Sequence, residues 1–323
     1  MFTLPMPSRR FRNPLRRWAA TALTAGSIAM MALPAWAGDP FRSTNAHPID
    51  NQTEAAFRAI FERGHYQEAA QILQSPNPNE PLAYAMRASL AYLNEDMNAL
   101  GENATLTREA AEQLVASDPL RGHLYTAVGY FLEGAHTIST EPAVRATPIV
   151  LGKLQQVFDN LEEAERIDPN DSELNLLKGY MDLMLAVNLP FSSPQQAIER
   201  LQTHAAPSYL AQRGIAVGYR DLNQQEQALA AVDRALQETP NNPDLLYLKA
   251  QILTRQSNHQ ASLRFYRRAL AQQNQLPRSL VIQISFEECR TQNRVNRRQR
   301  NCDAERDAQR EQASRPVRTG RSS

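Results

Sequence analysis

A period of 34 residues is the feature that most constrains how this chain can fold. Five landmark residues shift by 34 positions onto residues that mostly keep their size class: Tyr219, Ala228, Val232, Ala235 and Pro240 become Leu253, Ser262, Tyr266, Ala269 and Asn274. Helical periodicity runs from about residue 50 to about residue 275, and no segment alternates as a strand would. A chain that repeats two helices at this period is predicted to form an all-α solenoid.

Small residues recur where two helices of one unit would cross, because close packing needs a small side chain at the contact. The predicted packing residues are Ala216 and Ala250 in first helices, and Ala228, Ala235 and Ala269 in second helices. Pro240 cannot continue the preceding helix and therefore ends a unit. The next unit begins at Asn242-Pro243, where proline at the first helical position costs nothing.

Similar units recur upstream as "AAFRAIFERGHYQEAAQIL", "NLEEAERIDPND" and "LNLLKGYMDLMLA", and the second and third units carry longer connections. Over roughly residues 50–275 this pattern resembles the tetratricopeptide-repeat family. The resemblance implies a tetratricopeptide-type α-solenoid of about five helix-turn-helix repeats with a C-terminal capping helix. It also implies a non-enzymatic scaffold that binds a peptide or protein partner in a concave groove.

A second resemblance lies in the phrases "DLMLAVNLPFSSPQQAIERL" and "APSYLAQRGIAVGYRDLNQ". They are similar to an uncharacterised group of exported tetratricopeptide proteins of cyanobacteria, a resemblance that implies no known activity.

In this repeat the first helix of each unit lines the concave side, so residues near its small position face the groove. The predicted groove residues are Tyr130, Tyr180, Arg213, Val217, Arg220, Tyr247, Gln251 and Arg255. Aromatic and arginine side chains are common anchors of recognition surfaces. For Tyr130 and Tyr180 the alternative is packing between neighbouring units.

No pattern in the chain indicates catalysis. The six histidines are scattered, with no pair at helical metal-ligand spacing and none beside a cysteine. No glycine-rich phosphate loop or nucleophile elbow occurs. We therefore expect no enzyme, no cofactor and no metal site, and the mildly acidic body gives no reason to expect nucleic acid.

Residues 1–37 have the pattern of an export signal. Five arginines precede an apolar stretch that ends in Ala35-Trp36-Ala37, the small-x-small pattern that signal peptidase reads. We expect cleavage after Ala37 and, together with the cyanobacterial resemblance, a periplasmic or thylakoid-lumen setting. The alternative is an uncleaved membrane anchor, because 18–37 is about long enough to span a bilayer. Residues 38–50 read as a linker before the repeat domain at 51–275.

Residues 276–323 are predicted to form a capping helix followed by a basic, partly disordered tail. A continuous helix would hold Cys289 and Cys302 roughly 20 Å apart, whereas a disulfide needs Cα atoms within about 7 Å. Either the helix breaks between them or they do not pair. Two other functions remain open: a membrane-held adaptor whose tail touches an anionic surface, and a subunit of an envelope enzyme complex.

Overall fold

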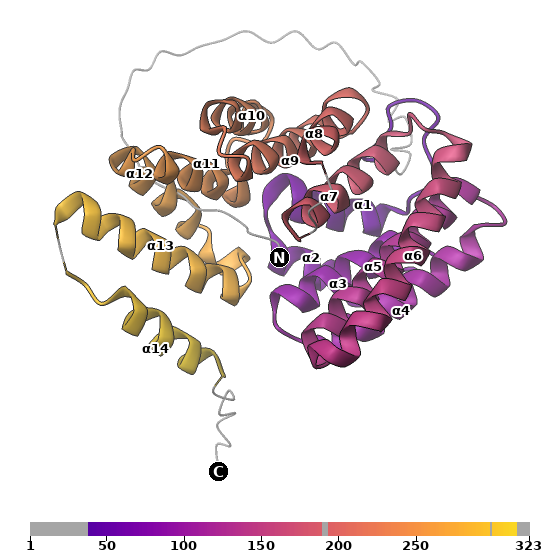
Figure 1. Cartoon of the computed structure of the whole chain (residues 1–323), viewed down its shortest axis with the longest axis horizontal. Helices are drawn as coiled ribbons and strands as arrows, with labels where there is room; N and C mark the ends of the chain where they lie inside the picture. The colour runs from indigo at the N-terminus through magenta and orange to yellow at the C-terminus, as the bar shows by residue number, and fades with distance from the viewer. Residues whose placement is uncertain (1–37, 189–192, 298, 315–323) are drawn as a thin grey trace, which may run out of the picture.

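The computed structural model describes residues 38–188, 193–297 and 299–314, so the expected signal at 1–37 lies outside the described residues. Within these ranges the chain is helical and contains no strand (Figure 1), which confirms the all-α fold class. The helices form six hairpins, where the sequence predicted about five. They are α1 (Asn51–Phe57), its π-helical extension η1 (Arg58–Arg63) and α2 (Tyr66–Ile72); α3 (Pro81–Leu93) and α4 (Met97–Leu114); α5 (Pro119–Thr140) and α6 (Ala143–Ile167); α7 (Ser172–Asn188) and α8 (Pro194–Thr203); α9 (Ser208–Asp221) and α10 (Gln225–Glu238); α11 (Pro243–Arg255) and α12 (His259–Leu270).

The helix boundaries follow the sequence signals. Asn242 caps α11 by accepting hydrogen bonds from the backbone N–H groups of Asp244 and Leu245 at 2.9 and 3.3 Å. Pro243 occupies the first position of that helix, and α10 ends at Glu238, two residues before Pro240. The extra residues of the third unit do not form the long connection that the sequence predicted. They extend α5 and α6 to 22 and 25 residues, with only two residues between these helices.

The predicted small residues lie at the helix contacts. Five alanines have no exposed surface at all: Ala216, Ala228, Ala235, Ala250 and Ala269. Ser262, the counterpart of Ala228 one period later, is equally buried, and its hydroxyl donates to the carbonyl of Ala250 at 2.8 Å. The core is therefore a continuous layer between helices, built from the residues that the period selects.

The solenoid curls back until its first hairpin touches its sixth (Figure 1). The Tyr66 hydroxyl on α2 donates to Asp244 Oδ2 on α11, 178 positions further along the chain. Asn242 Nδ2 donates to the carbonyl of Phe61 at 2.9 Å. Gly64, at the end of η1, faces the ring of Pro243. Because glycine has no side chain, this ring packs directly against the backbone of Gly64.

Residues 38–50, expected to be a linker, have no regular structure but are packed onto the repeats. Phe41 and Ile49 are both buried, and Phe41 meets the ring of Phe57 edge-on at a centroid distance of 4.9 Å. Burial of Phe41 and Ile49 removes their apolar surface from water, so the segment belongs to the core of the first hairpin.

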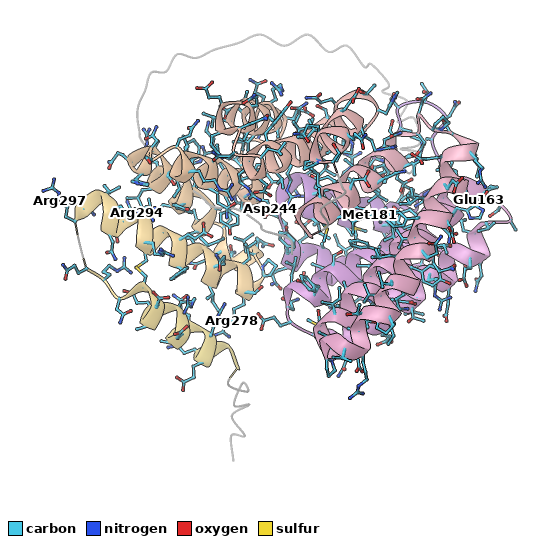
Figure 2. All side chains as sticks on the ribbon, in the orientation of Figure 1. Glu163, Met181, Asp244, Arg278, Arg294 and Arg297 are labelled. Atoms are coloured by element: carbon cyan, nitrogen blue, oxygen red, sulfur yellow. A yellow bond between two sulfur atoms is a disulfide. The ribbon has the colours of Figure 1, made fainter. Side chains whose placement is uncertain are left out.

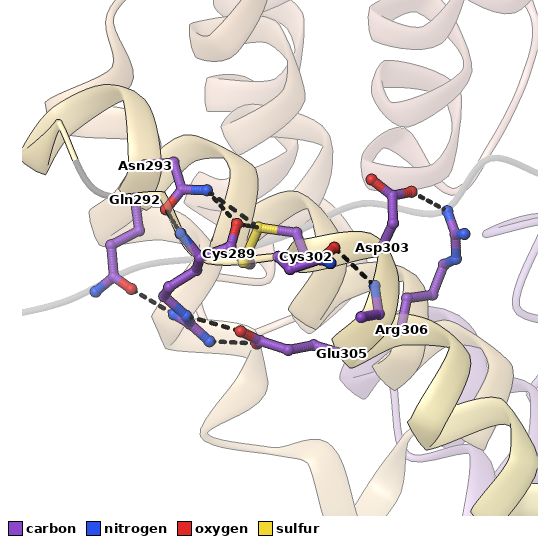
Figure 3. The surroundings of a disulfide bond; sticks show 10 residues. Cys289, Gln292, Asn293, Cys302, Asp303, Glu305 and Arg306 are labelled. Atoms are coloured by element: carbon purple, nitrogen blue, oxygen red, sulfur yellow. Dashed lines mark hydrogen bonds and ion pairs between the residues drawn. A yellow bond between two sulfur atoms is a disulfide. The ribbon is translucent and has the colours of Figure 1, made fainter.

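The C-terminal part holds the predicted capping helix, α13 (Arg278–Asn296), which follows the short 3-10 turn η2 (Gln273–Gln275). A second helix, α14 (Cys302–Ser314), folds back along it (Figure 1). The helix breaks at Arg297, whose φ of 51° is left-handed. The break brings Cys289 and Cys302 to a Cα separation of 5.8 Å, and the two cysteines form a disulfide (Figure 3). Of the two alternatives for these cysteines, the structure has the broken helix and the bridge.

Candidate interaction groove

A groove with a volume of about 800 Å³ lies along the first helices of the last three hairpins, α7, α9 and α11. Figure 2 draws the side chains as sticks and labels Met181 on α7 and Asp244 on α11, two of these three helices. One end of the groove is apolar and comes mainly from α7 and α9. The other end is polar and comes from the end of α9 and from α11, α12 and α13. The residues used below are Tyr180, Leu183, Val217, Arg213, Arg220, Asp221, Gln251, Thr254, Arg255, Tyr266 and Glu287.

At the apolar end, Tyr180 is held from two sides. Its hydroxyl donates to the carbonyl of Leu210 at 2.8 Å, and the Arg213 guanidinium lies 5.8 Å from the centre of its ring. Burial raises the pKa of Tyr180, so this hydroxyl stays neutral. Leu183 and Val217 complete an apolar wall beside it. This end can accept an apolar side chain of a partner.

At the polar end, two arginines share one carboxylate. Arg220 is only 3% exposed; its Nε donates to Asp221 at 2.8 Å, and its Nη1 donates to Gln251 Oε1 at 2.7 Å. Arg255 donates to the carbonyl of Arg220 at 2.6 Å and lies 3.4 Å from Asp221, with 46% of its side chain exposed. Arg255 is therefore the cation that a ligand can reach, whereas Arg220 joins α9 to α11.

Glu287 of the capping helix closes the polar end. It accepts hydrogen bonds from Tyr266 at 3.1 Å and from Gln283 at 2.7 Å. The contact with Tyr266 anchors α13 on α12, whereas Gln283 lies in α13 itself, and Glu287 makes the cap part of the groove wall. Neither Tyr266 nor Glu287 was predicted as a groove residue, because the sequence argument considered only first helices.

Six of the eight predicted groove residues line this groove: Tyr180, Arg213, Val217, Arg220, Gln251 and Arg255. The other two do not. Tyr247 is 1% exposed, and its hydroxyl donates to Glu287 of α13 at 3.4 Å. The capping helix therefore covers this side chain and keeps it out of the groove. Tyr130 lies between hairpins, with Arg108 and Lys153 at 5.6 and 5.8 Å from its ring centre. This placement matches the alternative stated for Tyr130.

A buried ionic cluster lies apart from the groove and joins three hairpins to residues 38–50. Glu173 has no exposed surface, yet it accepts hydrogen bonds from Arg42, Arg121 and Tyr125. Arg121 also donates to Glu80 at 2.8 Å. Burial raises the pKa of Glu80 even though Arg121 opposes the shift. Because these groups are hydrogen-bonded to one another, the cluster holds the three hairpins and the segment 38–50 together.

The described residues contain neither a candidate metal centre nor a candidate membrane span. In that part of the chain no three histidine, cysteine or acidic side chains come together in a way that could hold a metal ion. Nor does any helix there have the length and apolarity to cross a membrane. The groove combines an apolar wall that includes Tyr180, hydrogen-bonding groups and the exposed side chain of Arg255.

The described residues thus form an all-α array of helix hairpins of the tetratricopeptide type. Among solved structures, a thermophilic tetratricopeptide protein of Thermus thermophilus matches with 21% identity and a TM-score of 0.43. The match covers 64% of this chain and 98% of that one. No family model and no curated protein matches the sequence, so the resemblance to the cyanobacterial group has no support from the comparisons.

Proposed function

We propose that this chain is a scaffold that holds a short segment of a protein partner in the groove along α7, α9 and α11. The observation that carries the proposal is the groove itself, with an apolar wall at one end and an exposed arginine at the other. An apolar side chain of the partner would pack between Tyr180, Leu183 and Val217. An acidic group of the same segment would meet Arg255.

The two ends can be tested separately. Val217→Glu places a charge in the apolar wall, and Arg255→Glu reverses the accessible cation. Arg220 is not chosen, because its buried guanidinium connects α9 to α11 and its loss would disturb the fold. The matched control is Arg264→Glu, the same change of charge at an exposed position on α12 outside the groove.

Partners would be captured by crosslinking in native envelope extracts and identified by mass spectrometry. We expect each groove variant to lower the recovery of the reproducible partner at least tenfold, as the loss of about 1.4 kcal/mol or more of binding free energy would. Arg264→Glu should leave recovery unchanged. Equal capture by the wild-type chain and both groove variants would exclude the groove as the binding surface.

We also propose that the chain works in an exported compartment, the periplasm or a thylakoid lumen. The signal-like segment at 1–37 supports this proposal, and so does the disulfide, because disulfides persist mainly in oxidising compartments. Fractionation followed by mass measurement of the intact chain tests it. A chain found in the cytosol at its full-length mass would contradict it, and a full-length chain in the membrane fraction would favour the anchored alternative.

A further inference from the structure

The segment that begins at Gly38 is folded tightly around one carboxylate. Asp39 accepts hydrogen bonds from the backbone N–H groups of Phe41 and His47 at 2.8 and 3.0 Å, and from Arg42 at 2.7 Å. Asp39 is itself buried. Residues 38–47 therefore form a compact turn with a defined position for the first residue.

Two side chains anchor this turn to the repeats. Phe41 packs edge-on against Phe57 of α1. Arg42 reaches across to the start of α7, where it donates to Asp171 at 2.8 Å and to Glu173 at 3.0 Å. The anchors come from hairpins that are more than a hundred positions apart in the sequence, so the position of the turn is determined by the folded array.

At the free end of the turn, the backbone nitrogen of Gly38 lies 2.8 Å from Oε2 of Glu54 in α1. The Glu54 side chain is 17% exposed, and its Oε1 pairs with Arg58 at 2.7 Å. A Cβ at position 38 would lie 3.2 Å from the same carboxylate, so glycine allows this close approach. The nitrogen that meets Glu54 is also the one that cleavage after Ala37 would free.

We propose that Glu54 is the binding site for the α-ammonium group of a mature chain that starts at Gly38. This proposal rests on the expected cleavage after Ala37. Before cleavage the Gly38 nitrogen is a neutral amide with one proton to donate. Hydrolysis of the Ala37–Gly38 bond adds water, leaves a carboxylate on Ala37, and gives Gly38 a protonated amine with three donors and a full charge. Processing thus adds a charge-assisted hydrogen bond where the amide made an ordinary one.

Among the described residues, charged side chains have contacts at this end of the segment. Glu54 faces it from α1, and Arg58 shares that carboxylate from η1. Asp39, the adjacent residue, is engaged by Arg42. Because an anionic neighbour favours the protonated amine, the pKa of the Gly38 α-amine should lie above the ordinary value of about 7.7–8.0 for that group. The stabilisation is then present below about pH 8 and is lost as pH rises through the raised pKa.

The experiment begins with the full chain, exported by its own leader and purified in its processed form. Intact mass and N-terminal sequencing identify the first residue, expected to be Gly38. Acetic anhydride labelling as a function of pH then reports the α-amine, because only the unprotonated amine reacts. We expect labelling near pH 7 to be about tenfold slower for each unit by which the pKa is raised.

Glu54→Gln should restore the ordinary labelling rate. Glu62→Gln is the matched control, because Glu62 also pairs with Arg58 but has no contact with Gly38 in the structure. The wild-type chain labelled in urea gives a second comparison that does not depend on any variant folding. A first residue other than Gly38 overturns the proposal, and so does an amine that reacts at the same rate in the folded wild-type chain as in urea.

Discussion

Replacement of Gly64 by alanine should break the contact that closes the array. Gly64 has a φ of +70°, and an added Cβ would lie 2.4 Å from Cδ of Pro243. The left-handed conformation costs an L-residue about 1–2 kcal/mol. The overlap with the proline ring adds about 1–3 kcal/mol, as in other overpacked sites. We therefore expect Gly64→Ala to lower the free energy of unfolding by about 2–5 kcal/mol.

Urea unfolding followed by circular dichroism measures this loss as a shift of the midpoint. The control is Gly152→Ala, at an exposed position in α6 where the new Cβ meets nothing within 4 Å. There alanine should stabilise the helix by up to about 1 kcal/mol. In a Pro243→Ala background the ring is absent, so Gly64→Ala should cost only its backbone share of about 1–2 kcal/mol. An equal cost in both backgrounds would refute the contact between the first and sixth hairpins.

Three further perturbations test other parts of the structure. Burial opposes the charged form of Glu133, yet Lys153 and Arg108 hold the pKa of this carboxyl below its ordinary value. The stability that this carboxylate contributes is thus present above about pH 4.3 and lost as pH falls through the folded pKa. In urea titrations, Glu133→Gln should flatten the loss of stability between about pH 5 and 3. An unchanged slope would contradict this assignment. Burial raises the pKa of Asp244, and its Oδ1 has no hydrogen-bond partner within the described structure. Burial therefore disfavours the charged form, and the resulting stabilisation is full below about pH 3.9 and lost as pH rises through the folded pKa. Asp244→Asn should match or exceed the wild-type urea midpoint at about pH 7, and a clear decrease would show that the charge stabilises the fold. Cys302→Ser should release α14 from α13 and so speed amide exchange in α14. The urea midpoint of the repeats should stay nearly unchanged, because α14 contacts mainly α13. Unchanged exchange would mean that packing alone holds α14.

The repeat architecture could be predicted because its signals are local. A period, a small residue at each crossing and a proline between units are all visible within one or two units, and Ala216 and Ala250 are buried as that pattern requires. The same period predicted six groove residues on first helices. Position within a repeat determines which face a side chain occupies, and this information is present in the sequence.

Contacts between distant repeats have no such signal. Arg42 meets Asp171 across 129 positions, and Tyr66 meets Asp244 across 178. Neither pair is separated by the repeat period, so neither was predictable from it. Tyr247 was placed incorrectly for a related reason. Its position in the repeat is that of a groove residue, but it lies in the last unit. There the capping helix α13 covers the Tyr247 side chain, which a following repeat would leave exposed to the groove.

The long-range contacts also connect the closure of the array to the groove. Tyr66 on the first hairpin donates to Asp244, and the charge of Asp244 acts on Arg213, whose Nη1 lies 3.3 Å from the Tyr180 hydroxyl. Arg213 and Tyr180 both line the groove. The closing contact and the groove wall are therefore connected through Asp244 and Arg213. Because linkage is reciprocal, the proposed partner and the hairpin that closes the solenoid would act on each other through this arginine.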